Sequence, residues 1–114
     1  MTSGRSSVWT NLSYEATVAK GYWLTIYRSV SDPGRLAEYA ARATPAIEAA
    51  GGRILAREVA VKTYEGSGDQ RTVLIEFASV EQAIAAYEGR EYQEAAKLLR
   101  GAVDREVRIV AGVA

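Results

Sequence analysis

A single carboxylate inside an apolar run is the first candidate for chemistry in this sequence. Glu76 stands second from the end of the segment "RTVLIEF", residues 71–77, between Ile75 and Phe77. Three roles are open to it: a catalytic acid or base, one partner of an ion pair in a closed core, or a plain solvent-facing residue. If its face is buried, the side chain needs a cation, because an unpaired buried carboxylate is costly.

Tyrosines supply other polar groups suited to binding or proton transfer. The 114 residues include neither histidine nor cysteine, so the commonest general base, a thiolate nucleophile and the usual zinc and iron ligands are absent. Proton transfer would therefore rest on a tyrosine hydroxyl, Glu76 or an arginine. Tyr39, Tyr87 and Tyr92 fall on predicted helices, where they either pack in the core or line the cleft between helices and sheet. We expect no cofactor and no metal.

The elements that would carry these residues follow from composition and periodicity. Residues 22–30, 53–65, 71–77 and 104–113 are β-branched, aromatic or alternating, and are predicted strands. The glycine-containing stretch 66–70 is predicted to be a hairpin turn rather than a phosphate-binding loop, because it leads into a strand and not into a helix.

An amphipathic helix is predicted between the first two strands. Asp32 is a suitable N-cap, and Pro33 suits the first helical position. Apolar residues recur at helical spacing until two glycines at 51 and 52 end the pattern. Pro45 lies inside this helix and is expected to kink it or to break it near Thr44.

A second helical region is predicted before the last strand. Ser79 is its N-cap, and Gln82 is placed to complete a capping box. The helix is expected to run to about Tyr87, to be interrupted at Gly89, and to continue as "EYQEAAKLLR" to Arg100.

The resulting order, βαββαβ, predicts a ferredoxin-like α+β fold with two helices on one face of a four-stranded antiparallel sheet. Side chains of the first strand alternate between the two faces. One face receives Tyr22, Leu24 and Ile26, and the other receives Trp23, Thr25 and Tyr27. Both faces are therefore apolar, and the helices cover only one. A bare face with an exposed tryptophan and tyrosine would be an association site, so we expect a homodimer formed sheet against sheet.

Composition excludes several classes of partner. Fourteen basic and fourteen acidic residues are interspersed, so no basic surface is expected to bind nucleic acid. No apolar run approaches the roughly 20 residues that span a bilayer, so no membrane partner is expected.

The first 20 residues are polar, lack the pattern of a signal peptide, and are predicted to form a loose arm or to pack on a partner chain. We expect a cytoplasmic protein whose domain covers residues 21–114.

Residues 21–113 resemble the Domain of Unknown Function 1330 family, which belongs to the dimeric α+β barrel superfamily. The resemblance is carried by "DPGRLAEYAARATPAIEAAGGRILAR", "YEG", "LIEFASVEQAIAAYEGREYQEAAKLLR" and "VRIVAGV". The family has no established reaction. Its superfamily relatives include cofactor-free monooxygenases, lactone isomerases and stress-responsive barrel proteins, so the resemblance implies a fold more than an activity.

The resemblance also implies cationic partners for Glu76. The family pattern places one arginine at Arg57 and another at Arg100, at the end of the second helical region. An internal ion pair of Glu76 with either arginine is the favoured interpretation. The functional alternative is that these groups bind and polarise a small anionic or carbonyl ligand. The candidate ligand-binding residues are Tyr39, Arg57, Glu76, Tyr87, Tyr92 and Arg100, and the candidate catalytic residues are Glu76, Arg57 and Arg100.

Three functions are compatible with this inventory. The favoured one is a small homodimeric protein that binds a small organic ligand in the cleft between helices and sheet. The first alternative is a cofactor-free monooxygenase or isomerase that acts on a small aromatic or keto compound. The second alternative is a structural or assembly module without a ligand.

Overall fold

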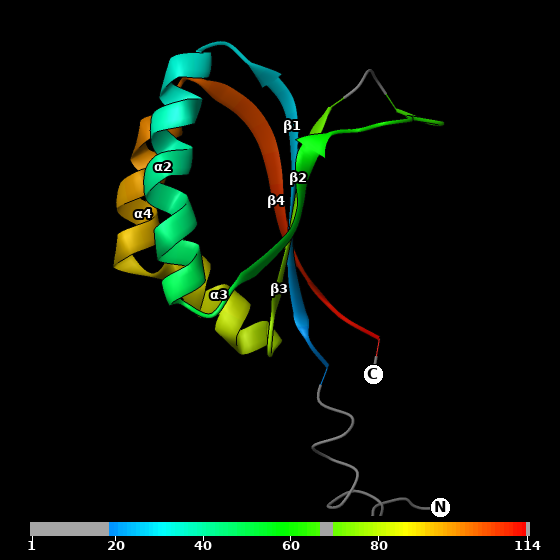
Figure 1. Cartoon of the computed structure of the whole chain (residues 1–114), viewed down its shortest axis with the longest axis vertical. Coiled ribbons are helices and arrows are strands. Elements are labelled where there is room, and N and C mark those ends of the chain that lie inside the picture. Colours follow the sequence, from blue (N-terminus) through cyan, green and yellow to red (C-terminus); the bar gives the residue numbers. More distant parts are fainter. Residues whose placement is uncertain (1–18, 67–69, 114) are drawn as a thin grey trace, which may run out of the picture.

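Helices cover one face of a four-stranded antiparallel sheet, as Figure 1 shows. The structure is a computed structural model and describes residues 19–66 and 70–113. Its elements in chain order are β1 (Gly21–Val30), α2 (Pro33–Ala49), β2 (Arg53–Val59), β3 (Arg71–Phe77), α3 (Val80–Glu88), α4 (Arg90–Ala96), the 3-10 helix η1 (Lys97–Leu99) and β4 (Val103–Ala111). The strand order across the sheet is β2-β3-β1-β4. These features confirm the predicted ferredoxin-like α+β fold.

The core lies between the helices and the face of the sheet that carries Trp23. Trp23 sits on the central strand β1, opposite Ile75 of β3 and Ile109 of β4. Its side chain is 1 % exposed. The indole ring stacks on Phe77 at a centroid distance of 6.3 Å and meets the ring of Tyr92 edge-on at 4.7 Å. The tryptophan therefore joins both neighbouring strands to α4.

Helix α2 begins as the sequence predicts. Asp32 accepts a hydrogen bond from the backbone nitrogen of Arg35 at 3.1 Å, which satisfies one of the free amides of the first turn. The expected break near Thr44 does not occur, because the helix is continuous to Ala49. Pro45 removes a single intrahelical hydrogen bond, and the buried sheet-facing residues on either side of it hold the helix in place.

The second helical region is divided at Gly89, as predicted. Ser79 caps α3 by accepting from the nitrogen of Gln82 at 3.1 Å. The reciprocal half of the capping box is shifted by one residue, since the Gln82 side chain accepts from the nitrogen of Ala78. The predicted continuation to Arg100 ends earlier, because α4 stops at Ala96 and η1 follows it.

Strand β2 is shorter than predicted and irregular. It ends at Val59, although extended chain was expected to residue 65. The pairing with β3 shifts register between Ile54 and Ala56, so one extra residue, Leu55, bulges out of β2. The bulge reverses the direction in which every later side chain of β2 points. The hairpin that follows is described only in part, because residues 67–69 lie outside the described residues.

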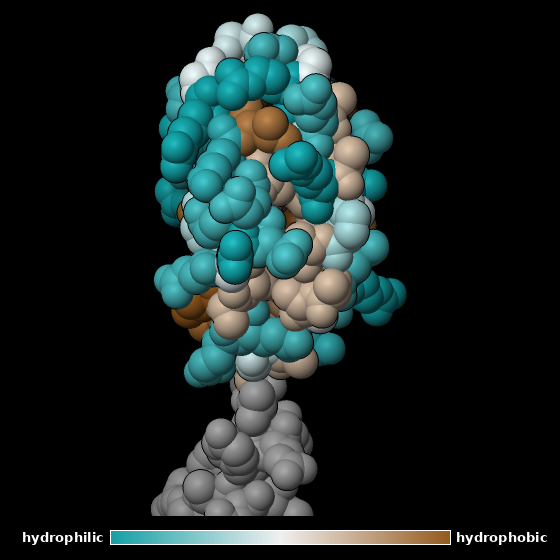
Figure 2. Space-filling model, turned by 90° about the vertical axis from the view of Figure 1, so that its left-hand side faces the viewer, coloured by the Kyte–Doolittle hydropathy of each residue, from teal (hydrophilic) through white to brown (hydrophobic). Residues whose placement is uncertain are grey.

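The two faces of the molecule differ in character. Hydrophilic residues cover much of the outer surface of the helical layer (Figure 2). The open face of the sheet carries half-buried or exposed apolar side chains along neighbouring strands, namely Tyr22, Leu24, Ile26, Leu74 and Val110. Trp23 points to the helices, so the expectation of an exposed tryptophan on the bare face is wrong, and Tyr22 is the aromatic residue there.

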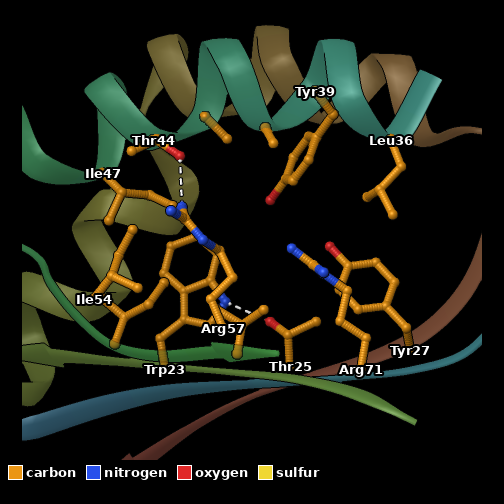
Figure 3. A pocket seen from close by; sticks show the side chains of 14 residues that line it. Trp23, Thr25, Tyr27, Leu36, Tyr39, Thr44, Ile47, Ile54, Arg57 and Arg71 are labelled. Carbon is orange, nitrogen blue, oxygen red and sulfur yellow. Dashed lines mark hydrogen bonds between the residues drawn. The ribbon is translucent and has the colours of Figure 1, made fainter. Parts of the chain in front are cut away.

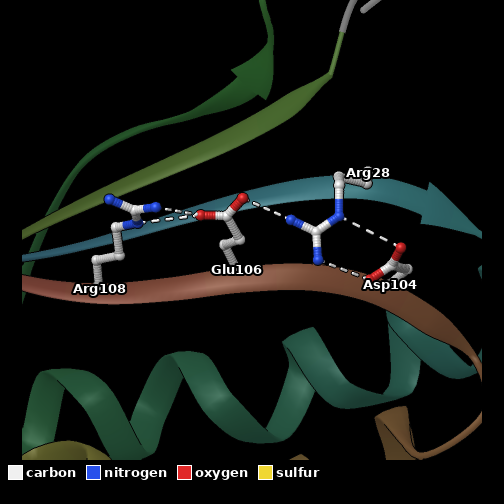
Figure 4. Close-up of polar contacts among 4 residues, drawn as sticks. All are labelled: Arg28, Asp104, Glu106 and Arg108. Carbon is white, nitrogen blue, oxygen red and sulfur yellow. Dashed lines mark hydrogen bonds and ion pairs between the residues drawn. The ribbon is translucent and has the colours of Figure 1, made fainter.

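Charged residues border this apolar surface along β1 and β4. Arg28 donates to Asp104 and to Glu106, and Glu106 also accepts from Arg108 (Figure 4). All four side chains are substantially exposed, so these pairs contribute little to stability. They neutralise one another, however, so Arg28 and Arg108 are not free to attract a ligand.

The predicted N-terminal arm, residues 1–20, falls almost entirely outside the described residues. In residues 19–66 and 70–113, no helix combines the length and the hydrophobicity needed to cross a membrane.

The first residue of β1 gives a test of this packing. A Cβ added at Gly21 would lie 2.5 Å from the carbonyl oxygen of Ser79 and 2.7 Å from the Cα of Val80, and backbone atoms cannot move aside cheaply. We expect Gly21→Ala to lower the free energy of unfolding by about 1–3 kcal/mol in a denaturant titration. Gly34→Ala is the control, because its Cβ would meet only Asp32 at an ordinary 3.5 Å. Equal effects of the two substitutions would contradict the packing described here.

Candidate functional site

A cavity lies between α2 and the sheet (Figure 3). The space open to water-sized molecules in it is about 40 Å³. A cavity that holds one water has about 10–15 Å³ of such space, so this cavity has room for a few waters. Strands β1, β2 and β3 and helix α2 supply the walls. The side chains that define its chemistry are Trp23, Thr25, Tyr27, Leu36, Tyr39, Thr44, Ile47, Ile54, Arg57 and Arg71.

Small residues on α2 create this space. Tyr39, Ala43 and Ile47 recur every four residues, so they share the side of the helix that faces the sheet. Ala40 and Ala43 both line the cavity. Their short side chains leave a gap above the sheet, and the larger Tyr39 and Ile47 stand on either side of it.

The floor of the cavity is largely apolar, and its indole nitrogen is hydrogen-bonded within the chain. The indole nitrogen of Trp23 donates to the hydroxyl of Thr25 at 2.9 Å. Thr25 is itself 2 % exposed, so this bond provides the buried indole with an acceptor. The floor therefore offers a flat ring for packing, and the indole nitrogen of Trp23 does not require a ligand.

Arg105 and three tyrosines form a cluster, of which Tyr27 and Tyr39 line the cavity, whereas Arg105 lines a separate hollow. The Arg105 guanidinium donates to Tyr92 at 3.0 Å and to Tyr27 and Tyr39 at 3.4 Å each. The hydroxyl oxygens of Tyr39 and Tyr92 are 2.6 Å apart. The guanidinium also lies over the rings of Tyr27 and Tyr39. Within residues 19–66 and 70–113, no carboxylate comes within 4.0 Å of Arg105.

Burial controls the protonation of this cluster. It is the main cause that raises the pKa of Tyr27, Tyr39 and Tyr92 above the ordinary tyrosine value, because the phenolate would be poorly solvated. Burial by itself would lower the pKa of Arg105, but the oxygens of Tyr92 and Tyr39 outweigh it and leave that pKa raised. At neutral pH the cluster is therefore one cation surrounded by three neutral hydroxyl groups.

Two further arginines give the cavity a positive character. Arg57 is exposed at the rim and donates to the hydroxyl of Thr44 at 3.0 Å. Arg71 is half-buried, and Figure 3 shows its guanidinium beside Tyr27. No aspartate or glutamate of the described chain lines the cavity. Such a site can bind a carboxylate or another oxyanion, for which a guanidinium has matching geometry.

The predicted ligand-binding residues separate into three groups. Tyr39 and Arg57 line the cavity, and Tyr92 contacts Tyr39 from behind it. Tyr87 and Arg100 instead line a separate hollow beyond the end of α4. Glu76 points to the open face of the sheet.

The expected internal pair of Glu76 with Arg57 or Arg100 is wrong. Glu76 accepts from the hydroxyl of Tyr22 at 3.0 Å, and the Lys20 amine lies 3.9 Å from its carboxylate. Arg57 would share its face if β2 were regular. The bulge at Leu55 instead turns Arg57 toward the helices.

Sequence reasoning missed Arg105, although a signal for it was present. In "DREVRIV", Val107 and Ile109 alternate with charged residues and pack against the core. Arg105 is two residues from Val107 and four from Ile109, so strand alternation predicts that its side chain lies on the same, core-facing side of β4. Arg71 is spaced by two residues from Val73 and by four from Ile75, so the same alternation places it on the helix-facing side of β3. In the described part of the chain, no three carboxylates gather where they could hold a metal ion.

Residues 20–113 match the family described as Domain of unknown function, DUF1330. The chain belongs to this family. No curated protein matches it. Among solved structures, this DUF1330 protein is similar to RPA0582, a protein of unknown function from Rhodopseudomonas palustris, with a TM-score of 0.69 and 17% identity over 96% of both chains.

Two other similar structures show the same fold. SnoaB, a cofactor-independent oxygenase from Streptomyces nogalater, has a TM-score of 0.60 and 10% identity over 82% of this chain and 92% of its own. A dimeric ferredoxin-like protein of unknown function from Thermobifida fusca has the same TM-score and identity over 95% and 99%. At these identities the likeness establishes the fold of the DUF1330 chain alone.

The tyrosine–arginine cluster generates a stability prediction. Tyr92→Phe removes the acceptor that lies nearest to the Arg105 guanidinium. Hydrogen bonds to charged groups contribute about 1.5–3 kcal/mol to the free energy of unfolding. We therefore expect a loss of that order in the free energy of unfolding. Tyr87→Phe is the matched control, because Tyr87 packs on the same rings but its hydroxyl makes no hydrogen bond in the described chain. A similar loss in both variants would show that the cluster's hydrogen bonds contribute no stability.

Proposed function

We propose that this DUF1330 protein binds a small organic acid in the cavity between α2 and the sheet. One observation carries the proposal: two arginines and several aromatic rings line a cavity that has no carboxylate among its described lining residues. An acid would find a cation for its carboxylate and a flat apolar surface for its carbon atoms.

The size of the cavity limits the ligand. Its free volume of about 40 Å³ admits a few waters or a very small molecule with the side chains as they stand. The exposed Arg57 can widen the rim by giving up its bond to Thr44, because its long side chain has many rotamers. A ligand of a few carbon atoms is therefore favoured over a large one.

An enzymatic role is the second candidate. The tyrosine hydroxyls and arginines at the cavity could stabilise negative charge that develops on a substrate oxygen, which is one requirement for forming an enolate, and a base from the substrate or solvent would have to take the proton. The similarity to the oxygenase SnoaB is compatible with this role but extends only to the fold. Oxygen consumption in the presence of a bound acid would distinguish turnover from binding.

We also propose that the open face of the sheet joins two copies of the chain. Its central strands present Leu24, Ile26 and Leu74, which one chain leaves partly exposed. Burying such a surface is favourable by roughly 25 cal/mol per Å² of apolar area. The similar Thermobifida fusca protein is dimeric.

Binding of a carboxylate should depend on Arg71. We expect Arg71→Gln to weaken binding of pyruvate by about tenfold or more, since a charged hydrogen bond is lost, while Arg42→Gln on the outer side of α2 leaves it unchanged. An NMR titration of the folded variants measures both dissociation constants. If the two substitutions have equal effects, the acid binds elsewhere and the proposed site is wrong.

Assembly is tested by light scattering on the purified protein. We expect a mass of twice the 12.3 kDa of one chain. Leu74→Lys should reduce the mass to that of a single chain, because it places a charge at the centre of the proposed interface. Ile84→Lys changes an exposed residue on the helical side and should leave the dimer intact. A monomeric unmodified protein would overturn the proposed interface.

A further inference from the structure

The hydroxyl pair of Tyr39 and Tyr92 has a proton arrangement that can be deduced. The two oxygens are 2.6 Å apart, so one hydroxyl donates to the other. Arg105 donates to both oxygens and cannot accept. Tyr92 is 1 % exposed, and within the described residues its hydroxyl has hydrogen-bond contacts with Tyr39 and Arg105 only.

Burial favours one of the two hydroxyls as the donor. The proton of Tyr92 has one available acceptor, the oxygen of Tyr39. If Tyr39 donated instead, the proton of Tyr92 would be buried without an acceptor, which folded proteins avoid. This favours Tyr92 as the donor to Tyr39, whose oxygen then receives hydrogen bonds from both Tyr92 and Arg105.

With Tyr92 as the donor, the proton of Tyr39 is left for an acceptor in the cavity. Tyr39 lines the cavity and Tyr92 does not. Figure 3 shows the Tyr39 hydroxyl pointing from α2 into the space above the sheet, where the Tyr27 hydroxyl and the Arg71 guanidinium also lie. Because burial raises the pKa of Tyr39, this hydroxyl stays protonated at neutral pH and acts as a donor.

We propose that Tyr39 donates a hydrogen bond to a neutral oxygen of the ligand while Arg71 binds the ligand's carboxylate. This inference rests on the proposed function and narrows its ligand to a small acid with a carbonyl oxygen beside the carboxylate, a 2-oxo acid. The cavity places one cation and one neutral donor together, and a 2-oxo acid presents one charged and one neutral acceptor at adjacent carbons. Tyr92 and Arg105 are positioning residues, since they act through Tyr39.

Two acids that differ only at this oxygen test the inference. Pyruvate has the carbonyl oxygen, and propionate has a methylene group in its place. We expect the unmodified protein to bind pyruvate about three- to tenfold more tightly than propionate in NMR titrations, the effect of one neutral hydrogen bond. Tyr39→Phe should abolish this preference and leave the affinity for propionate within about twofold. Tyr87→Phe should retain the preference.

Each other outcome is informative. If Tyr39→Phe weakens both acids equally, Tyr39 has a structural role, and this inference is wrong although carboxylate binding stands. If the preference survives in Tyr39→Phe, another group contacts the carbonyl oxygen, and the inference is again wrong. If neither acid binds the unmodified protein, the proposed function fails and the inference fails with it.

A ligand-free measurement tests the proton arrangement independently. Tyr39→Phe leaves the buried Tyr92 proton without its acceptor, whereas Tyr92→Phe removes that proton together with its oxygen. We therefore expect Tyr39→Phe to lower the melting temperature more than Tyr92→Phe does. The reverse order would show that Tyr39 donates to Tyr92, and this would overturn the inference even without a ligand.

Discussion

The cation of Arg105 beneath the helices is the interaction on which the candidate site depends. Arg105 is partly buried, and a charge withdrawn from water is costly unless it is hydrogen-bonded; in the described chain three phenol oxygens rather than a carboxylate serve this purpose. The hydroxyls come from β1, α2 and α4, and Arg105 itself is on β4. One guanidinium therefore ties together two elements from the first half of the chain and two from the second.

Neutral partners leave the positive charge of this cluster uncompensated. The contrast lies on the other face of the same two strands, where Arg28 and Arg108 pair with Asp104 and Glu106. Charge is cancelled among these four exposed residues and retained at the tyrosine–arginine cluster. With Arg57 and Arg71 at the cavity, the retained charge creates a positive potential in a confined and partly apolar space. A small anion bound in the cavity would neutralise part of this positive charge.

Periodicity predicted the fold because each element carries its own local signal. Asp32 and Ser79 cap helices, Gly89 divides the second helical region, and alternation identifies the strands. The ion pair of Glu76 could not be predicted correctly, because the face on which Arg57 lies depends on a bulge at Leu55. A bulge is a matter of pairing between strands, and the sequence of β2 alone does not indicate it.

The candidate site was predictable in part for the same reason. Tyr39 and Tyr92 lie on helical positions that face the sheet, so periodicity placed them near the cavity. The alternation of side chains along β4 predicts an inward-facing position for Arg105. An arginine among other charged residues, however, suggests an exposed position. The hydrogen bonds of its guanidinium to three separate elements follow from the tertiary fold and cannot be read from local spacing.

The central claim is most directly tested by a crystal structure of the protein grown with pyruvate. We expect pyruvate in the cavity between α2 and the sheet, with its carboxylate within hydrogen-bond distance of Arg71 and its carbonyl oxygen within hydrogen-bond distance of the Tyr39 hydroxyl. An acid bound instead in the hollow beside Lys97 and Arg100, with the cavity under α2 closed by its own side chains, would contradict it.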